Sequence, residues 1–404
     1  MRIRSTGLAL FAGLSVFVAA CGTSGTSVAP STAPTDGPAT TAPTDAPASV
    51  EPTAGPGADL KIGVVTDVGT VNDKNFNEYT YVGAQLGAAA VGAAEPPVVV
   101  PTSDADYGPL IQAFIDQEFD IIVAAGFNLE GVTAAAAKAN SDIWFIGVDH
   151  APCINAAGDV DPTFADCSGD IAVLLPNYIA IKYAEDQAGY LAGIVAASVV
   201  PGVDIIGAIG GVSLCGPCIR YIQGYELGAK SINPDITVKA NWVSDSDFRI
   251  GFADQAAGKT FGQQFIAQNT GIDVLFQVAG LTGNGVIDAA CEAGIGAIGV
   301  DVDQHESYPA SQACILTSAE KKLSNSVSQS IVAIADGSAA GGSTLFDAAN
   351  DGIGVSAFYD AASKLNPDTQ SLVDAALAAM KAGTLVTCPA DTCGSQDGLA
   401  DLGD

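Results

Sequence analysis

The chain has 404 residues, of which 48% are hydrophobic, so it can form two or more domains with substantial cores. Lys and Arg total 15 against 45 Asp and Glu, giving a formal net charge of −30. This charge argues against a nucleic-acid partner and against adsorption to anionic lipid headgroups, and it favours solubility outside the cell.

The N-terminus predicts export. Arg2 and Arg4 precede an apolar run from Leu8 to Ala20, which is typical of a secretory signal and too short to span a bilayer. The run ends in Val-Ala-Ala-Cys at Cys21, which resembles a bacterial lipobox with Val in place of the usual Leu. An ordinary signal peptide with an incidental Cys is the alternative. We expect residues 1–21 to be a lipoprotein signal, Cys21 to carry the lipid, and the protein to be extracytoplasmic and held to the bacterial cell membrane by that lipid only.

Low-complexity segments flank the predicted folded body. Residues 22–58 consist mainly of Thr, Ser, Pro, Ala and Gly, which cannot bury enough apolar surface to fold. We expect a disordered linker there, a two-lobed domain over residues 59–390, and a flexible Gly- and Asp-rich tail over residues 391–404.

The cysteines predict disulfides. The chain has nine Cys, and eight remain when the predicted lipid-bearing Cys21 is set aside, an even number in an exported protein. These eight lie in pairs that are close in the sequence. Local bonds are expected, although spacing alone leaves the connectivity open. The neighbours are Cys153 and Cys167, Cys215 and Cys218, Cys291 and Cys314, and Cys388 and Cys393.

The body begins with a strand, a polar turn and a helix. Ile62–Val65 is a short apolar run typical of a strand buried on both faces. Asp67 lies in the turn, and Asp73 or Asn75 can cap a helix that starts near Phe76. Because the turn follows the carboxyl end of a strand, it lies where open α/β sheets bind their ligands.

Strand and helix patterns then alternate in two units, which predicts parallel sheets covered by helices. In the first unit, strands are predicted at 98–100, 120–124 and 143–148, and helices at 107–117 and 129–140. In the second, strands are predicted at 205–209, 237–243, 273–278 and 297–300, and helices at 184–199, 218–232, 255–269 and 285–293. Further helices are predicted at 319–336 and 369–382. We expect one lobe over about 59–175 with a return segment after about 302, and a second over about 176–301 with part of the C-terminal region.

Polar residues recur where the predicted strands end. Asp149, Gly280, Asp301 and Asp303 follow three strands, as Asp67 follows the first. A single acid at such a place is often a helix cap, but several on one sheet edge favour a ligand site.

Several segments also match one known family in order and spacing. The turn from Asp67 to Asn77 resembles a D-x-G-x-x-D-D-x-S-F-N motif, with Asn72 and Asn75 replacing an acid and a Ser. Other matches are AEDQAGYLAGIVAA (184–197), IGAIGGV (206–212), YIQGYELGAK (221–230), INPDITV (232–238), GFADQAAGK (251–259), FQVAGLTGNGVIDAA (276–290), IGVDVDQ (298–304) and ILTSAEKKL (315–323). The chain from Leu60 to about Ala379 thereby resembles the basic membrane protein family, the lipoprotein substrate-binding proteins of nucleoside ABC importers, whose best-understood branch is the purine nucleoside receptor group.

The resemblance implies a fold and a way of holding a base. The fold is α/β, of the periplasmic-binding-protein type I, with two Rossmann-like lobes, parallel sheets and a hinged cleft. Two Phe rings would sandwich a purine. Phe76 matches the first ring and Phe252 the second, with Phe248 as the alternative because Gly251 replaces a Ser and residues 245–250 look inserted.

The resemblance also assigns polar ligand contacts. Asp67 and Asp149 would contact the base or shape its pocket, beside Asn72 and Asn77 of the opening turn. Asp301 would accept hydrogen bonds from the ribose hydroxyls, or Asp303 if the register differs by two. Lys321 would hydrogen-bond nearby from a helix on which Lys322 points away, and Gly280 would let the backbone approach the ligand.

Sequence signals for catalysis or for a cofactor are weaker than the family resemblance. The Cys-Gly-Pro-Cys run at 215–218 matches a thioredoxin motif, but its surroundings favour a short structural disulfide. The glycines at 280–285 lack the G-x-G-x-x-G spacing, and neither a His–acid metal spacing nor a G-x-S-x-G turn occurs. We therefore expect no cofactor, no metal site and no catalysis.

The predicted function is that of a lipid-anchored substrate-binding protein of an ABC importer. Its partners would be a nucleoside, a purine nucleoside before a pyrimidine one, and a permease with its ATPase; we expect a monomer. The alternatives are an exported nucleoside-processing enzyme and a sensory or adhesive surface lipoprotein of the same fold.

Overall fold

The computed structural model describes residues 55–399. The predicted signal peptide with Cys21, residues 22–54 of the predicted linker, and residues 400–404 lie outside the described residues. The end of the predicted linker belongs to the folded body, because the Gly57 N–H donates to the Val91 carbonyl over 3.0 Å.

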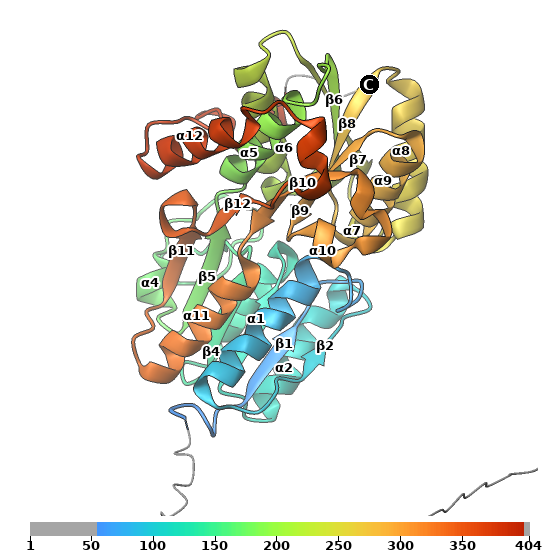
Figure 1. Ribbon diagram of the computed structural model, residues 1–404. Helices are drawn as coiled ribbons and strands as arrows, with labels where there is room; N and C mark the ends of the chain where they lie inside the picture. The colour runs from blue at the N-terminus through green and yellow to red at the C-terminus, as the bar shows by residue number, and fades with distance from the viewer. Residues whose placement is uncertain (1–54, 400–404) are drawn as a thin grey trace, which may run out of the picture. The chain divides into compact units, whose positions relative to one another are not determined.

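Two six-stranded sheets form the framework, one in the lower and one in the upper part of Figure 1. The first has the order β11-β5-β4-β3-β1-β2 and is parallel throughout. Its strands are β1 (Ile62–Val65), β2 (Val98–Val99), β3 (Ile121–Ala125), β4 (Trp144–Val148), β5 (Tyr178–Tyr183) and β11 (Gly342–Phe346). We call this sheet with its helices lobe 1.

The second sheet has the order β12-β10-β9-β8-β6-β7, and only its edge pair β10–β12 is antiparallel. Its strands are β6 (Ile205–Val212), β7 (Thr237–Ser244), β8 (Ile272–Val278), β9 (Gly296–Asp301), β10 (Ile315–Lys321) and β12 (Ile353–Val355). We call this sheet with its helices lobe 2.

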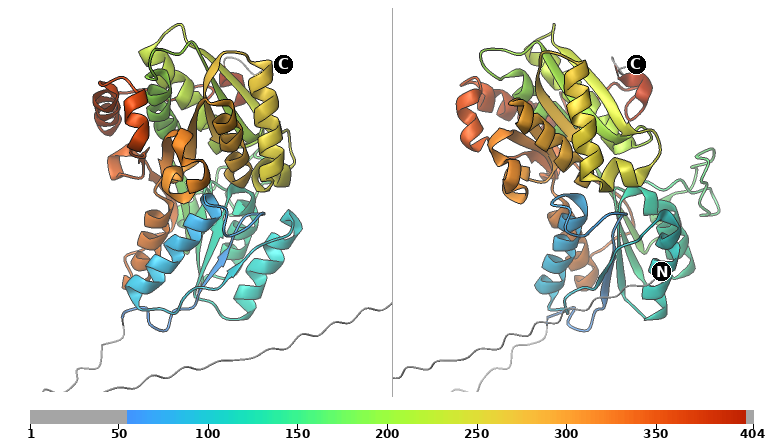
Figure 2. Two further views of the ribbon diagram at one scale, coloured as in Figure 1. Left: turned by 45° about the vertical axis from the view of Figure 1, so that its right-hand side comes forward. Right: turned by 90° about the vertical axis from the view of Figure 1, so that its right-hand side faces the viewer.

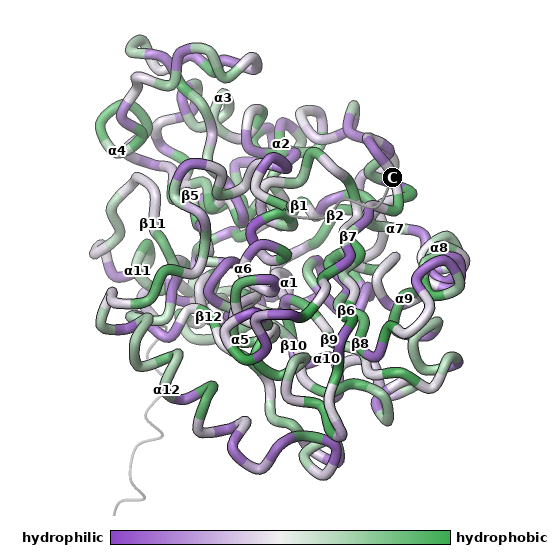
Figure 3. Tube along the Cα trace, turned by 90° about the horizontal axis from the view of Figure 1, so that it is seen from above, coloured by the Kyte–Doolittle hydropathy of each residue, from purple (hydrophilic) through white to green (hydrophobic). Residues whose placement is uncertain are grey.

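Helices cover both faces of each sheet, as the pattern predicted. They are α1 (Phe76–Val91), α2 (Tyr107–Asp116), α3 (Glu130–Ala139), α4 (Ile171–Leu174), α5 (Glu185–Ala197), α6 (Gly216–Ile232), α7 (Phe248–Ala253), α8 (Gln255–Gln268), α9 (Gly280–Ala293), α10 (Gln304–Ser307), α11 (Leu323–Asp336) and α12 (Thr369–Lys381). In lobe 1, α1 and α11 lie side by side (Figure 2), while α2 and α3 form part of a separate core. The outer helix α12 buries Val373, Ala376 and Met380, and hydrophilic and hydrophobic residues alternate along it (Figure 3).

The lobe boundaries differ from those expected. The strand Tyr178–Tyr183 completes lobe 1, so the chain passes to lobe 2 at about residue 184 rather than 176. The chain does return to lobe 1 after residue 302, but later than expected: β10 stays in lobe 2, and α11 and β11 come back to lobe 1.

The helix predicted to start near residue 319 begins at Leu323 instead. Ala319 and Glu320 are good helix formers, but strand pairing overrides that preference, because β10 is bonded to β9 on one side and to β12 on the other. Lys321 is therefore the last residue of strand β10. The expectation that Lys321 and Lys322 point apart because they lie on one helix does not apply.

The predicted tail is fastened to lobe 2 as far as residue 399. The Gln223 amide of α6 donates to the carbonyls of Thr392 and Ser395 over 2.8 and 2.9 Å, and the Gln396 amide donates to the Ser213 carbonyl. The expectation of a free tail from residue 391 was wrong for this part, since the composition gave no sign of the amide on α6 that holds it.

All four local disulfides are confirmed: Cys153–Cys167, Cys215–Cys218, Cys291–Cys314 and Cys388–Cys393. Within residues 55–399, no helix is both long and apolar enough to cross a bilayer.

Candidate functional site

A cavity lies where the carboxyl ends of strands from both lobes meet. Eight of the nine predicted ligand residues line it: Asp67, Phe76, Asn77, Asp149, Phe252, Gly280, Asp301 and Lys321. The ninth, Asn72, is exposed and lies outside the lining.

The turn after β1 presents Asp67 to the cavity. Its carboxylate accepts hydrogen bonds from the Val68 N–H over 2.7 Å and from the Tyr107 hydroxyl, while its own N–H donates to Asn77 Oδ1 over 3.1 Å. Burial raises the pKa of Asp67 to about 6, although these donors oppose the rise. No cation neutralises this carboxylate among its hydrogen-bond partners in the described chain.

Asp73 both caps α1 and lines the cavity. The N–H groups of Asn75, Asn77 and Glu78 donate to its carboxylate over 2.9 to 3.1 Å. The cap is therefore Asp73 and not the alternative Asn75, whose side chain makes no cap hydrogen bond. Burial raises the pKa of Asp73 to about 6, against the effect of these three N–H groups.

Aromatic rings reach the cavity from both lobes. Phe76 begins α1 in lobe 1, and Phe252 lies on α7 in lobe 2. Phe127, between β3 and α3, adds a third ring whose centroid is 6.5 Å from that of Phe252. Phe248 stacks on Phe252 from behind, 6.3 Å away, and lines a neighbouring pocket instead. Phe252 is thus the lobe 2 ring that borders the cavity.

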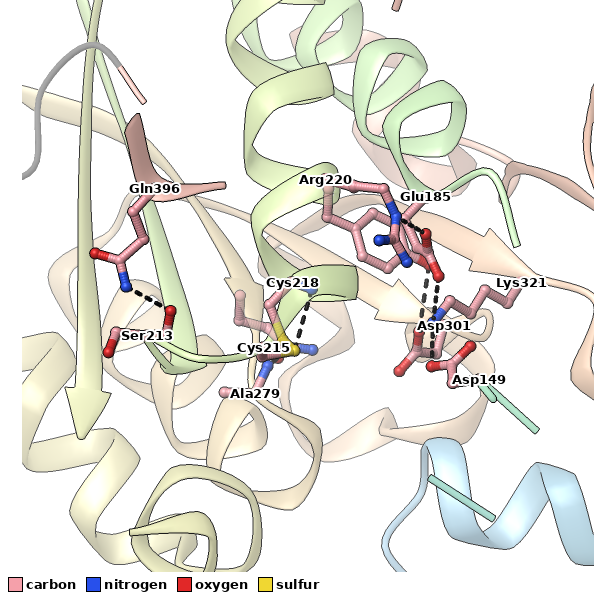
Figure 4. The surroundings of a disulfide bond; sticks show 12 residues. Asp149, Glu185, Ser213, Cys215, Cys218, Arg220, Ala279, Asp301, Lys321 and Gln396 are labelled. Carbon is pink, nitrogen blue, oxygen red and sulfur yellow. Dashed lines mark hydrogen bonds and ion pairs between the residues drawn. A yellow bond between two sulfur atoms is a disulfide. The ribbon is translucent and has the colours of Figure 1, made fainter. Parts of the chain in front are cut away.

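A buried ionic cluster forms the other wall (Figure 4). Lys321 Nζ lies 2.6 Å from Asp149, 3.2 Å from Glu185 and 3.8 Å from Asp301. Arg220 Nε on α6 lies 2.6 Å from the other Glu185 oxygen. Asp149 belongs to lobe 1, and the other four residues come from lobe 2, so Lys321 ties the lobes together.

The opposite charges of the cluster partly offset the cost of burying one another. Burial opposes the charge of Lys321, but Asp149, Glu185 and Asp301 raise its pKa, so the lysine is protonated at neutral pH. Burial would also raise the pKa of Glu185, but Arg220 and Lys321 lower it overall. Burial raises the pKa of Asp149 to about 6, against the effect of Lys321.

The two strand-end aspartates have the same backbone conformation. Asp149 has a φ of 62° and Asp301 a φ of 65°, in the left-handed region that non-glycine residues rarely adopt. Asp301 accepts a hydrogen bond from the Tyr221 hydroxyl over 3.2 Å, and the buried Asp149 Oδ1 has no partner within the described chain. Asp303 instead caps α10 and accepts a hydrogen bond from Tyr359, so Asp301 is the acid at the cavity.

Hydrogen bonds join the lobes beside the cavity. The Asn284 amide of lobe 2 donates to the Asp73 carbonyl over 3.0 Å, and the Ser307 hydroxyl donates to the Lys74 carbonyl over 2.8 Å. The two lobes are therefore in contact beside the cavity.

A family model described as ABC transporter substrate-binding protein PnrA-like (Bmp) matches residues 60–377, well over half of the chain. The chain belongs to this family. The Bmp family is one of substrate-binding proteins of ABC transporters rather than of enzymes, and it is the family that the sequence motifs indicated.

Two relatives are similar over much of this Bmp protein. ABC transporter nucleoside-binding protein BmpA of Lactococcus lactis is 29% identical over 257 residues, 61% of this chain and 65% of that protein. The alignment thus spans just under two thirds of that relative. Basic membrane protein A1 of Borrelia garinii is 27% identical over 268 residues, 66% of this chain and 70% of that protein.

Solved structures support the fold. A solute-binding protein of an ABC transporter system from Aeropyrum pernix superposes with a TM-score of 0.67 at 22% identity, covering 82% of this chain and 94% of that one. One from Conexibacter woesei gives 0.61 at 22% identity, covering 81% and 98%. At these identities the likeness establishes the architecture alone, and it confirms the predicted type I periplasmic-binding-protein fold.

Sequence reasoning missed several residues of this Bmp site. Phe127 and Tyr221 carry no local polar pattern that marks a site, and both reach the cavity only through the packing of the lobes. Cys215, Pro217 and Cys218 also line the cavity, so the predicted structural disulfide is part of the wall. Within residues 55–399, no group of His, Cys, Asp or Glu side chains is arranged to hold a metal ion.

Proposed function

We propose that this protein is a lipid-anchored substrate-binding protein that delivers nucleosides, and purine nucleosides in particular, to an ABC permease and its ATPase. The single observation that carries the proposal is that rings from both lobes and carboxylates from both lobes border one cavity. A flat base with a hydroxyl-bearing sugar is the ligand class that needs both features.

The rings would hold the base. Phe76 and Phe252 offer flat apolar faces from opposite lobes, so a base between them favours lobe closure. Stacking of a base on an aromatic side chain contributes about 1–3 kcal/mol in nucleic-acid binders. The carboxylate of Asp67, which has no cation beside it, would accept a hydrogen bond from an N–H on the edge of the base.

The ionic cluster would hold the ribose. Asp301 and the unpartnered Asp149 Oδ1 are acceptors for two neighbouring hydroxyls, and Lys321 can donate to a sugar oxygen. A site with unpartnered buried acceptors discriminates against ligands that lack the matching hydroxyl. We therefore expect ribonucleosides to bind more tightly than 2′-deoxyribonucleosides.

The names of relatives support the proposed nucleoside ligand and the proposed lipid anchor. The Lactococcus lactis relative is named a nucleoside-binding protein, and three Pyrococcus relatives are named lipoproteins. With a lipid on Cys21, residues 22–54 would connect the membrane to the folded body. The protein itself would do no catalysis.

Calorimetry with a ligand panel tests the proposal. The panel contains adenosine, guanosine, inosine, cytidine and 2′-deoxyadenosine, with D-allose as a sugar control because a solved structure of similar fold contains it. We expect purine ribonucleosides to bind and to be recovered intact by chromatography. Release of free base would indicate an enzyme. Binding of D-allose and of no nucleoside would show that the ligand is a sugar.

Removing the lobe 1 ring gives a sharper test. Phe76→Ala should weaken purine binding by roughly tenfold, about one stacked base, because it removes one face of the sandwich. Phe164→Ala is the matched control, since that ring is 60% exposed on the loop closed by Cys153–Cys167 and does not line the cavity. Equal affinity of the two variants would exclude stacking on Phe76.

The two lobe 2 rings can be separated in the same way. Phe252→Ala should weaken binding by roughly tenfold, whereas Phe248→Ala, which removes only the ring behind, should cost less than threefold. A larger loss for Phe248→Ala would assign the stacking to Phe248.

A further inference from the structure

The Cys215–Cys218 disulfide is the only one of the four described disulfides whose cysteines line the cavity. The two residues are 2% and 4% exposed, and the open space that they border is the cavity. A bond that borders a binding site can respond to what fills the site, whereas a bond in the core cannot.

The disulfide also fixes a helix that carries site residues. Cys215 precedes α6, and its sulfur accepts a hydrogen bond from the Cys218 N–H over 3.1 Å. Arg220 and Tyr221 follow within the next turn and bond to Glu185 and Asp301, as Figure 4 shows for the charged pair. The first turn of α6 is therefore shared by the disulfide and the ionic wall of the site.

We propose that Cys215–Cys218 is a redox-sensitive site coupled to the ligand cavity: reduction by a small-molecule thiol weakens ligand binding, and bound ligand protects the disulfide from reduction. The proposal rests on the proposed nucleoside function for the identity of the ligand.

Packing explains why the oxidised form binds more tightly. Bonded sulfurs lie about 2.0 Å apart, and two thiols need a clearly larger separation. The wall has little room for that shift, because both cysteines are almost fully buried and pack in the same apolar core as Ile219. Separated sulfurs must then move into the cavity or displace the first turn of α6, and either change disturbs the ligand site.

The chemistry is ordinary thiol–disulfide exchange. A thiolate attacks one cysteine sulfur, forms a mixed disulfide and releases the other cysteine as a thiolate. A second small-molecule thiolate then attacks the small-molecule sulfur of the mixed disulfide and releases the bound cysteine as a thiolate, which leaves two cysteine thiols after protonation and one oxidised small-molecule disulfide. The protein gains two electrons and two protons. The position of Cys215 before a 17-residue helix favours the thiolate form of the reduced pair.

Linkage makes the proposal quantitative. If reduction weakens ligand binding by some factor, saturating ligand must make the disulfide harder to reduce by the same factor. We expect about tenfold, within the usual 5–150-fold range of coupling between sites.

The experiment uses the intact protein and the nucleoside that binds best in the panel. The protein is equilibrated in glutathione buffers with and without saturating nucleoside, alkylated, and digested so that each cysteine pair is followed by mass spectrometry. The ratio [GSH]²/[GSSG] at half-reduction of Cys215–Cys218 should rise about tenfold with ligand, and the other three disulfides should not shift.

A variant pair tests the same coupling by affinity. Cys215→Ser/Cys218→Ser should bind the nucleoside about tenfold more weakly than wild type. Cys388→Ser/Cys393→Ser is the matched control, since that disulfide also contacts α6, through Gln223, but does not line the cavity, and it should stay within twofold.

The outcomes separate the two proposals. Unchanged half-reduction with ligand, together with wild-type affinity of the cavity variant, overturns the redox coupling while the nucleoside function stands. Failure of oxidised wild type to bind any nucleoside overturns the proposed function, and the coupling with it. If the cavity variant does not fold, the wild-type glutathione titration decides alone.

Discussion

Two groups of buried carboxylates border the same cavity, and they are held in different ways. Asp149, Glu185 and Asp301 surround Lys321 and Arg220, so cations offset the cost of burying their charge. The carboxylates of Asp67 and Asp73 are held by N–H groups and a hydroxyl, without a cation. The first group we call the ionic cluster, the second the turn acids.

The difference indicates what each group contributes. The ionic cluster joins the lobes through Asp149 and Lys321, so its charges serve the fold as well as the ligand. Burial raises the pKa of both turn acids to about 6, and the folded protein bears that cost at neutral pH. In the ionic cluster burial raises the pKa of Asp149 to about 6 as well, against the effect of Lys321, and only Glu185 has a lowered pKa. Buried charges that destabilise the fold yet border a cavity are typical of a binding site, where stability is lost for the sake of function.

The largest expected effect comes from removing the central cation. Lys321→Met should lower the free energy of unfolding by about 3–5 kcal/mol, because it leaves buried carboxylates without their shared partner. Urea denaturation followed by circular dichroism at pH 7.5 measures it. Lys322→Met is the control: that lysine pairs with Glu320 near the surface and should cost less than about 1 kcal/mol. Equal losses would show that the cluster contributes no more than a surface pair.

The next effect has the opposite sign. Asp67→Asn removes a carboxyl whose pKa is about 6 in the folded chain against an ordinary value of 3.8. Such a group stabilises the fold fully below pH 3.8, and this contribution is lost as the pH rises through about 6. The full shift corresponds to about 3 kcal/mol, and partial exposure to the cavity reduces it, so we expect a gain of about 1 kcal/mol at pH 7.5.

The same variant should bind nucleosides less well. Loss of a charged acceptor for a base N–H costs about 1.5 kcal/mol or more, which is at least tenfold in affinity. Urea denaturation at pH 4.5 and 7.5, with calorimetry at pH 7.5, measures both quantities. A variant that is less stable at pH 7.5 than wild type would contradict the assignment of Asp67 as an uncompensated acid.

The turn acids were predictable from sequence because their signals are local. An apolar run, two acids and a helical pattern within Ile62–Val91 indicate a strand, a turn and a capped helix, and the structure has all three. The four disulfides were predictable for the same reason, since each joins neighbouring cysteines. What sequence could not decide locally was which Asn or Asp of the turn faces the cavity: Asp73 does and Asn72 does not.

The ionic cluster was only partly predictable, because distant residues build it. Glu185 and Arg220 lie 35 positions apart, and no local pattern links them to one another or to Lys321. The strand Tyr178–Tyr183 that leads to Glu185 was hidden behind an irregular loop, and Lys321 was expected on a helix that begins two residues later. Pairing between strands decides both, and pairing is a tertiary effect.

The smallest effect tests whether neutral donors hold the turn acids as inferred. Tyr107→Phe removes the hydroxyl that donates to Asp67 but keeps the ring, which is 2% exposed in the lobe 1 core. Without this donor the pKa of Asp67 should rise above about 6, because the ionised form loses more than the neutral one.

The stability loss from Tyr107→Phe should therefore depend on pH in a set direction. At pH 7.5, where Asp67 is ionised, we expect a loss of about 1 kcal/mol, the usual net contribution of one hydrogen bond. At pH 4.5 Asp67 is protonated and needs the donor less, so the loss should shrink to a few tenths of a kcal/mol. Tyr79→Phe, in a half-buried ring outside the cavity lining, controls for the loss of a hydroxyl. An equal loss at both pH values would mean that Tyr107 supports packing rather than the charge of Asp67, and the contrast between the two groups of acids would then rest on Asp73 alone.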